Sequence, residues 1–488
     1  MLAHDRLIPH CRTYARMNPL PNLFLADLGP DLVLTPKTVR EACQTVRRNR
    51  ESWLTQLRTR QIAEIIGYTA EQWLDPQNGL RLRALAEAPA QIGISSTTLA
   101  RGLDHFLRQL TPENLEGLVA QDLGDTRRLD DFTGGPIELR SGRSAIARRP
   151  ELLGHITAGN LPIPALQSIT LGLLLRSAQF VKCATGASLL PRLFAHSLAL
   201  TEPRIGSCLE LAEWSGGNSD LEDAFFSEVQ CLTATGSDTT LENVRRRVPL
   251  HVRFVGYGHR VSFAYVTSDM LTTYSVKRVI RDLANDVTAW NQLGCLSPHV
   301  VYVQDDGVHS PEAVAEMLAE ELARREKEDP RGDIPVAEAA AIASRRSIYQ
   351  MRAGKSLDTV EKLQVDTAFR DMPGGVRIWE SPDSTAWTVV YDNDPRFEFS
   401  CLNRFIYVKP VHQLAEVLRY AEPIRHQVST VAVAALDHRL TDLARDLARW
   451  GVARICPVGR MQEPPLAWRH DGRPTLGDLI QWTDLEAP

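Results

Sequence analysis

Residues 233–247, TATGSDTTLENVRRR, place an apolar approach directly before a helical segment. Ser237 or Asp238 can cap that helix, because short polar side chains accept hydrogen bonds from the first free backbone N–H groups of a helix. Such a turn suits a phosphate group, although an ordinary joint between a strand and a helix has the same pattern. The stretch therefore predicts a strand, a capped helix and a candidate phosphate site.

Short apolar runs alternate with helical segments on both sides of this stretch, from about residue 148 onward. Alternation of this kind predicts parallel β-α-β units. The run HVRFVGYGHRVSFAYV, 251–266, closes the region, and a long helix is expected over about 271–290. Beyond it, two helices are expected at about 311–326 and 336–348, followed by the strand-like runs GVRIWE and TAWTVVY. This order predicts a second α/β domain. Residues 1–150 are predicted to be mostly helical.

The length and composition predict two large domains plus a small appendage, because 488 residues exceed what one hydrophobic core usually organises. A net charge of -5 provides no general field for a polyanion, so nucleic acid is not an expected partner. Charged residues near the N-terminus argue against a signal peptide, and prolines interrupt the uncharged run 156–175. We expect a cytoplasmic protein without a membrane span.

The eight cysteines are scattered, with no C-x-x-C pair and no cluster of zinc-ligand spacing. This predicts free thiols in a reducing compartment and no metal site, with most of the cysteines acting as small buried hydrophobic residues. Cys295 is the exception to examine. It lies in NQLGCLSPHVVYV, 291–303, on an expected turn from a helix into a strand.

Two further side chains follow strand-like runs. Asn160 lies in GHITAGNLPIPALQS, 154–168, where its amide could donate hydrogen bonds to an oxyanion or could only turn a loop. Lys182 follows the run in FVKCATG, where it could reach a ribose or a phosphate or could be a solvated lysine at a strand end. The residues alone leave both choices open.

Taken in order, these segments resemble the LuxC family of acyl-CoA reductases, fatty-acid reductases that supply aldehyde for bacterial luminescence, within the aldehyde dehydrogenase superfamily. The resemblance covers roughly 150–488 and is carried by segments that occur in the family's order: GHITAGNLP, TATGSDTTLENVR, GHRVSFAYV, GCLSPHVVYV, NRFIYVKPV and RHDGRPTLGDLIQW. It implies an aldehyde dehydrogenase-like α/β fold. In that fold, residues 1–260 hold a helical region and a Rossmann-type cofactor domain, 261–455 form the catalytic domain, and 456–488 form a C-terminal arm that often mediates oligomerisation.

The resemblance also assigns roles to individual residues. Cys295 would be the acylated nucleophile, and Asn160 would hold the oxyanion together with the backbone N–H of Cys295. Lys182 would contact the adenosine ribose of NADPH, while Thr235, Gly236 and Ser237 would meet the cofactor phosphates.

The implied reaction is the NADPH-dependent reduction of an acyl-CoA, or of a thioester on a carrier or partner protein, to the aldehyde through an acyl-cysteine. The implied partners are an acyl-protein synthetase or an acyl carrier protein, and the chain is expected to be a homo-oligomer.

One departure from the superfamily separates this reaction from its rivals. Hydrolytic aldehyde dehydrogenases carry a glutamate in a Glu-Leu-Gly-Gly pattern, whereas this chain reads VGYGHR, with His259 as the nearest titratable residue. Glu398 also lies out of register with the glutamate that often holds the nicotinamide ribose. The alternatives to reduction are hydrolytic aldehyde oxidation, which needs a base that activates water, and acyl transfer through Cys295 without redox chemistry.

Overall fold

The computed structural model describes residues 20–29, 33–362 and 375–486. These residues form two compact units. Unit 1 comprises the described residues up to 92, residues 100–259 and those from 465 onward, and unit 2 comprises residues 93–99 and 260–464. Both units are α/β, which confirms the predicted fold class. No helix within the described ranges has the length and apolar content that crossing a membrane requires.

A five-stranded parallel sheet is the centre of unit 1, with strand order β4-β3-β2-β5-β6. Its strands are β2 (Leu152–Ile156), β3 (Ala178–Cys183), β4 (Leu209–Glu213), β5 (Cys231–Thr235) and β6 (Arg253–Tyr257). The helices that connect them are α8 (Ile163–Leu174), α9 (Leu189–Thr201), α10 (Pro203–Gly206), α11 (Ser219–Phe226) and α12 (Asp238–Arg247). The parallel β-α-β units that the alternating pattern predicts are confirmed.

Among the N-terminal helices of unit 1, the first described one lies directly on this sheet, and others pack on the helices that connect its strands. They are α2 (Pro36–Trp53), α3 (Thr59–Leu74), α4 (Gly79–Ile92), α5 (Ser96–Gln109, which begins in unit 2), α6 (Pro112–Leu123) and α7 (Pro136–Arg140). Helix α2 begins at a threonine cap followed by proline, and its apolar stripe packs with α11 on Leu152 and Phe180 of the sheet. Alternate strand residues such as Leu153 and Val181 face the opposite side, where α8 and α9 pack.

Unit 2 contains a seven-stranded sheet, in the order β13-β12-β7-β8-β11-β10-β9, and only the β9–β10 pair is antiparallel. Its strands are β7 (Val261–Val266), β8 (Pro298–Gln304), β9 (Val376–Glu380), β10 (Thr388–Asp392), β11 (Phe405–Val411), β12 (Val428–Ala434) and β13 (Arg454–Pro457). Its helices are α13 (Val276–Thr288), α14 (Pro311–Glu328), α15 (Val336–Lys362), α16 (Leu414–Tyr420) and α17 (Asp437–Trp450). Separate apolar clusters fill its two faces.

Two details differ from the sequence prediction. The run 251–266 is not one element, because β6 ends at Tyr257 in the unit 1 sheet and β7 begins at Val261 in the unit 2 sheet. The helix expected over 271–290 is shorter, since α13 spans Val276–Thr288 and a 3-10 turn, Ala289–Gln292, follows it.

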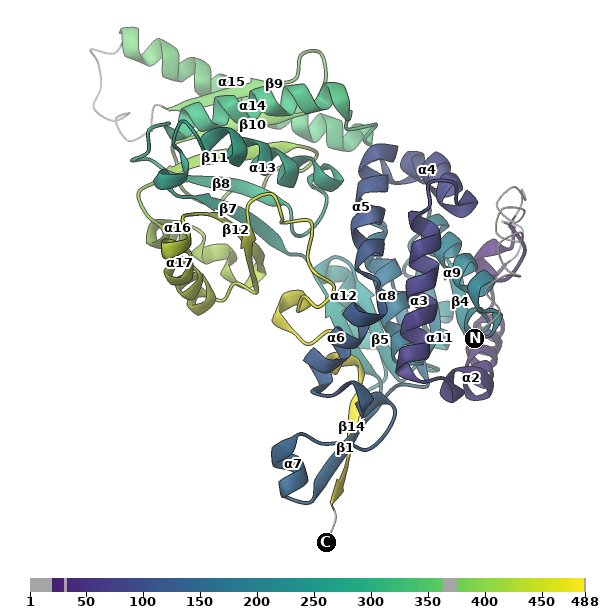
Figure 1. Cartoon of the computed structure of the whole chain (residues 1–488). Coiled ribbons are helices and arrows are strands. Elements are labelled where there is room, and N and C mark those ends of the chain that lie inside the picture. The colour runs from purple at the N-terminus through teal and green to yellow at the C-terminus, as the bar shows by residue number, and fades with distance from the viewer. Residues whose placement is uncertain (1–19, 30–32, 363–374, 487–488) are drawn as a thin grey trace. The chain divides into compact units, whose positions relative to one another are not determined.

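A small two-stranded ribbon joins distant parts of unit 1. Strand β1 (Arg143–Arg148) pairs antiparallel with β14 (Gln481–Glu486), near the C-terminus (Figure 1). Residues of the tail up to 464 belong to unit 2, and those from 465 onward belong to unit 1.

His155 is buried in the middle of β2 between two neutral partners. Its Nδ1 lies 2.7 Å from Thr233 Oγ1 and its Nε2 lies 3.0 Å from Gln179 Oε1. Since an amide oxygen can only accept, Nε2 carries the proton of the neutral ring. Burial lowers the pKa of His155 to about 4, because no nearby charge compensates the loss of hydration of the imidazolium ion.

We therefore expect His155 to make the protein less stable as the pH falls from about 6.5 toward 4. Between these pH values the unfolded chain binds a proton at His155 and the folded chain does not. The free energy of unfolding therefore falls by about 3 kcal/mol in total. Urea unfolding at several pH values should show a shallower pH dependence for His155→Gln than for the native protein. His251→Gln, at an exposed histidine, is the control. Parallel curves for native and His155→Gln would contradict this assignment.

Candidate functional site

The carboxyl edge of the unit 1 sheet gathers the cofactor residues that the sequence predicted. The chain proceeds outward from β2 to β3 and β4, and then returns to place β5 on the other side of β2. The loops that leave β2 and β5 consequently flank a topological switch point, where open α/β sheets bind ligands. Asn160 lies on the first loop, Gly236 and Ser237 form the second, and Lys182 lies at the same edge of β3.

Ser237, rather than Asp238, caps α12. Its hydroxyl accepts a hydrogen bond from the backbone N–H of Thr240 at 3.2 Å. The preceding turn begins at Thr235, the last residue of β5, and the N–H of Gly236 donates to the Tyr257 carbonyl oxygen at 3.2 Å. This turn is fixed by the neighbouring strand as well as by its own helix.

Lys182 is not a solvated surface lysine, because only 7% of the residue is exposed. Burial lowers the pKa of its ammonium group, while the charges of Glu222 and Glu213 act in the opposite direction. The ammonium nitrogen lies 6.0 Å from the centre of the Trp214 ring, and no carboxylate oxygen of the described residues lies within 4 Å of it. A buried donor without a close ion-pair partner is suited to hydroxyl groups of a bound ligand.

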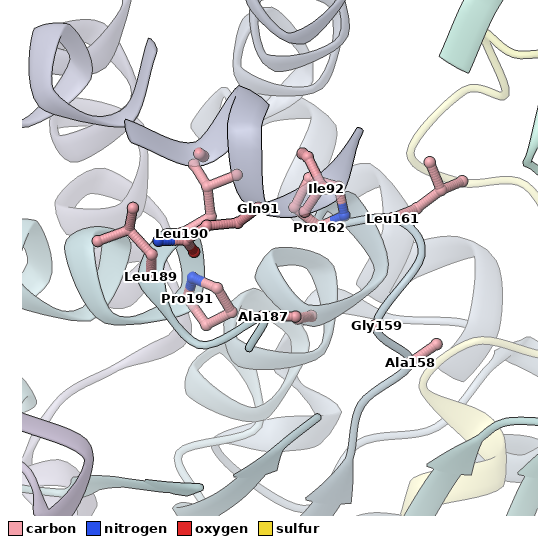
Figure 2. Close-up of a pocket in the computed structure, with 12 residues that line it drawn as sticks. Gln91, Ile92, Ala158, Gly159, Leu161, Pro162, Ala187, Leu189, Leu190 and Pro191 are labelled. Carbon is pink, nitrogen blue, oxygen red and sulfur yellow. The ribbon is translucent and has the colours of Figure 1, made fainter. Parts of the chain in front are cut away.

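Asn160 is exposed on the loop between β2 and α8. The loop is tied to β3 at its start, where the N–H of Thr157 donates to the Lys182 carbonyl oxygen at 3.1 Å. An apolar pocket borders the same loop, and Figure 2 shows Gly159 and Leu161, on either side of Asn160, among its lining residues. The asparagine therefore lies on a loop that is anchored at the ligand edge of the sheet.

Unit 2 holds Cys295, one of only two partly exposed cysteines in the described chain, the other being Cys401. The remaining described cysteines are buried, and burial raises the pKa of Cys183, Cys208, Cys231 and Cys456 to about 12. Thiols of this kind stay protonated and unreactive at neutral pH. Burial also raises the pKa of Cys401. Cys11 lies outside the described residues.

No group of three metal-ligating side chains that could hold an ion occurs in the part of the chain that the structure describes.

Cys295 follows a turn that leads into β8. Its carbonyl oxygen accepts a hydrogen bond from the Ser262 hydroxyl at 2.8 Å, and the N–H of Ser297 donates to the Gly294 carbonyl oxygen at 2.9 Å. Ser262 lies at the start of β7, so the strand next to β8 fixes the backbone of the cysteine. The predicted turn from helix to strand is confirmed.

Three consecutive non-glycine residues just ahead of this turn have positive φ angles. Trp290, Asn291 and Gln292 have φ values of 53°, 51° and 64°. Residues other than glycine rarely adopt positive φ angles, and those that are held there cluster at functional sites. Asn291 donates to the Arg331 carbonyl oxygen at 2.8 Å, and Gln292 donates to the carbonyl oxygens of Pro298 and Phe405, at 2.7 and 2.8 Å.

A second segment of the same kind packs against the first. Leu402, Asn403 and Arg404 have φ values of 59°, 53° and 65°. Arg404, which is 1% exposed, donates to Asn291 Oδ1 at 3.1 Å and to Glu326 Oε2 at 2.8 Å. The two left-handed segments thus hold each other through buried side chains. Neither segment contains a glycine, so this geometry had no signal in the sequence.

His299, four residues after Cys295, was also missed by the sequence reasoning. It is buried, and its Nδ1 accepts the backbone N–H of Ser400 at 3.1 Å. Since a backbone N–H can only donate, the neutral ring carries its proton on Nε2. The ring packs against Phe397 and Phe399, with centroids 6.1 and 5.9 Å away.

The stretch VGYGHR contains no acidic residue, but a carboxylate reaches it from α12. Asp238 Oδ1 accepts the backbone N–H of His259 at 2.9 Å, and a side chain at Gly258 would overlap the Asp238 carboxylate. The parallel pairing of β5 with β6 brings these residues together, because both follow the carboxyl ends of neighbouring strands. Strand order, which the sequence did not provide, was the signal needed to find Asp238.

Glu398 is engaged within unit 2. Its two oxygens accept hydrogen bonds from Arg345 and Tyr349 of α15, both at 2.7 Å. These bonds account for both carboxylate oxygens and give Glu398 a structural role between α15 and the segment ahead of β11.

The fold is similar to that of aldehyde dehydrogenases. Proline utilization A superimposes with a TM-score of 0.67 and 15% identity over 98% of this chain, which spans 46% of that longer chain. The Δ-pyrroline-5-carboxylate dehydrogenase of Mycobacterium tuberculosis gives 0.62 and 14%, covering 92% of this chain and 82% of that one. A candidate aldehyde dehydrogenase of Burkholderia cenocepacia gives 0.64 and 14%, with 92% of each chain covered.

Within that fold, residues 54–482 match the family described as Acyl-CoA reductase (LuxC), and the chain belongs to this family. Two relatives are named long-chain acyl-protein thioester reductase. The protein from Aliivibrio fischeri is 22% identical over 439 residues, 88% of this chain and 83% of its own length. The protein from Vibrio harveyi is 20% identical over 445 residues, 89% of this chain and 84% of its own length. The predicted family is confirmed.

Proposed function

We propose that this protein reduces an acyl thioester to the aldehyde through a covalent acyl-Cys295 intermediate, with NADPH as the reductant. The observation that carries the proposal is the placement of Cys295, a partly exposed thiol on a turn anchored by Ser262 and two left-handed segments. Family membership supports the same chemistry.

In the first step, the Cys295 thiolate attacks the thioester carbonyl carbon. A carbon–sulfur bond to Cys295 forms, the bond to the donor thiol breaks, and the departing thiolate takes up a proton. The exchange of one thioester for another costs little free energy, which suits a reversible acylation. The Asn160 amide and the Cys295 backbone N–H would donate to the oxyanion that develops on the carbonyl oxygen.

The carboxyl edge of the unit 1 sheet fits a nicotinamide dinucleotide. Lys182 would donate to a ribose hydroxyl, and the turn formed by Thr235, Gly236 and Ser237 would meet the phosphates at the start of α12. When bound, a reduced nicotinamide would supply a hydride, and the acyl-cysteine would accept it to become a thiohemiacetal. Asn160 would again hold the oxyanion. Collapse of the thiohemiacetal would return the Cys295 thiolate and release the aldehyde. The choice of NADPH rests on the family resemblance.

The acyl donor would be an acyl-CoA or an acyl group carried as a thioester on a protein. The relatives from Aliivibrio fischeri and Vibrio harveyi are named for acyl-protein thioesters. A partner that delivers such a group, an acyl-protein synthetase or an acyl carrier protein, therefore belongs to the proposal.

The β1–β14 ribbon would mediate self-association. An isolated two-stranded ribbon is marginally stable in water, and β14 is exposed along its whole length. Exposed apolar side chains gather on the ribbon and on the adjoining α7: Ile137, Leu139, Trp482 and Leu485. A second copy of the chain would cover them, in keeping with the expected homo-oligomer.

Replacement of Cys295 by Ala should abolish both acylation and aldehyde formation. After incubation with a long-chain acyl-CoA and no cofactor, intact-protein mass spectrometry should show one acyl group on the native protein and none on Cys295→Ala. Cys401→Ala, which removes the other partly exposed thiol, should still acquire the label. A label that persists in Cys295→Ala would assign the acylation to another residue.

Asn160→Ala and Lys182→Ala should fail in different ways. Loss of an oxyanion donor should slow acyl transfer on the order of a hundredfold and leave NADPH affinity unchanged. Loss of the Lys182 donor should weaken NADPH binding about tenfold, the effect of one charged hydrogen bond, and leave cofactor-free acylation unchanged. Nicotinamide fluorescence titrations and the mass assay read the two effects separately. Acylation within about twofold of native in Asn160→Ala would return Asn160 to a loop role, and unchanged NADPH binding would do the same for Lys182.

The acyl-enzyme should be long-lived in water and should discharge mainly as aldehyde when NADPH is added, because VGYGHR contains no acidic residue to activate water and the carboxylate that reaches it, Asp238, accepts the backbone N–H of His259. The test is to label the enzyme, remove free acyl-CoA and follow the loss of label with and without NADPH. His259→Ala and Asp238→Asn should remain as slow in water as the native enzyme. Fatty acid released without cofactor as fast as aldehyde forms with it would favour the hydrolytic reading. Label lost only to added thiols, with or without NADPH, would favour acyl transfer.

A further inference from the structure

A loop of unit 2 that follows β13, residues 458–464, reaches the turn that carries the nucleophile. Gln462 Nε2 donates a hydrogen bond to the Ser297 hydroxyl, two residues after Cys295. The same amide lies against the residue before Cys295, since a Cβ atom added to Gly294 would come within 2.8 Å of both Gln462 Nε2 and Oε1. One side chain thus contacts the turn on both sides of the nucleophile.

Two buried residues, Asp286 and Arg454, hold this loop in place. Asp286, on α13, accepts the backbone N–H groups of Gly459 at 2.6 Å and Met461 at 2.9 Å. Arg454, on β13, donates to the carbonyl oxygens of Met461 and Arg460, at 2.6 and 2.7 Å. The backbone immediately ahead of Gln462 is therefore fixed by side-chain hydrogen bonds from two different elements.

Arg454 also interacts electrostatically with Cys295. Burial lowers the pKa of its guanidinium group, while Coulomb interactions with Cys456, Asp286 and Cys295 raise it.

We propose that Gln462 is a positioning residue for Cys295: its amide, seated on Gly294 and bonded to Ser297, sets the orientation of the nucleophile turn. This inference rests on the proposed role of Cys295 as the acylated residue. Gln462 does not touch the reacting atoms in this assignment, and Asp286 and Arg454 act through it by holding its loop.

The test uses the full chain with three variants, Gly294→Ala, Gln462→Ala and the double variant, with Glu463→Ala as the matched control. Glu463 is the next residue of the loop, and its side chain pairs at the surface with Arg460. Two rates are measured for each protein. The first is alkylation of Cys295 by iodoacetamide, read by mass spectrometry, which needs neither acyl donor nor cofactor. The second is acyl transfer from a long-chain acyl-CoA, and thermal unfolding midpoints accompany both.

Gly294→Ala should lower both rates tenfold or more, because its methyl group displaces the Gln462 amide. Adding Gln462→Ala should restore alkylation at least severalfold by making room for that methyl group, so that the two substitutions are strongly non-additive. Gln462→Ala alone should lower acyl transfer about tenfold, keep the alkylation pH profile in place and leave the unfolding midpoint within a few degrees. Glu463→Ala should match the native protein.

Additive effects in the double variant, or both rates within twofold of native in Gln462→Ala, would overturn the assignment. The assignment would also be overturned if the unfolding midpoint of Gln462→Ala fell so far that partial unfolding accounted for the whole loss of acyl transfer. That result would favour a purely structural role. A native protein that is alkylated at Cys295 but never acylated would refute the proposed function. The non-additivity of the alkylation rates would then still decide whether Gln462 positions the turn.

Discussion

The hydrogen bond between Arg404 and Asn291 joins two backbone segments that are in the left-handed conformation. The local sequence of either segment would not favour that conformation by itself. Six non-glycine residues with positive φ lie in these segments, and each such residue costs on the order of 1 to 3 kcal/mol. The strain persists because the surroundings determine it from several sides: Arg404 reaches Asn291 and Glu326, while Gln292 reaches the strands on which both segments end. The position of Cys295 depends on this pair of segments, because the cysteine lies three residues after the end of the first one.

A division of roles between the two units follows from the two sheets. Unit 1 presents its candidate binding groups at the carboxyl edge of a parallel sheet, on loops whose length is short and whose ends are fixed by neighbouring strands. Unit 2 presents a single thiol on a strained turn backed by buried side chains. A nucleophile requires one orientation, and the buried contacts around this turn determine its backbone from several sides.

The sequence allowed the fold class, the strand and helix around Ser237 and the turn at Cys295 to be predicted, because each depends on local pattern and capping chemistry. It could not show that Lys182 is buried, since burial depends on Trp214 and on helices far away in the chain. Nor could it reveal the contact between Asp238 and His259, which requires the order of β5 and β6 in the sheet. The left-handed residues at 290–292 and 402–404 were unpredictable for a stronger reason: tertiary contacts impose a conformation that local preference opposes. The roles of Asn160, Lys182, Thr235, Gly236 and Ser237 remain predictions.

The pairing of β1 with β14 has a consequence for synthesis on the ribosome. Arg148 and Gln481, partners in this ribbon, are 333 residues apart in the chain. At about 5 to 20 residues per second, β1 would wait roughly 17 to 67 s for its partner to be made. During that time the ribbon edge stays open, and the whole of unit 2 emerges before unit 1 can close. Unit 1 can therefore be completed only after the residues of unit 2 have been made, because its last strand lies beyond them in the chain.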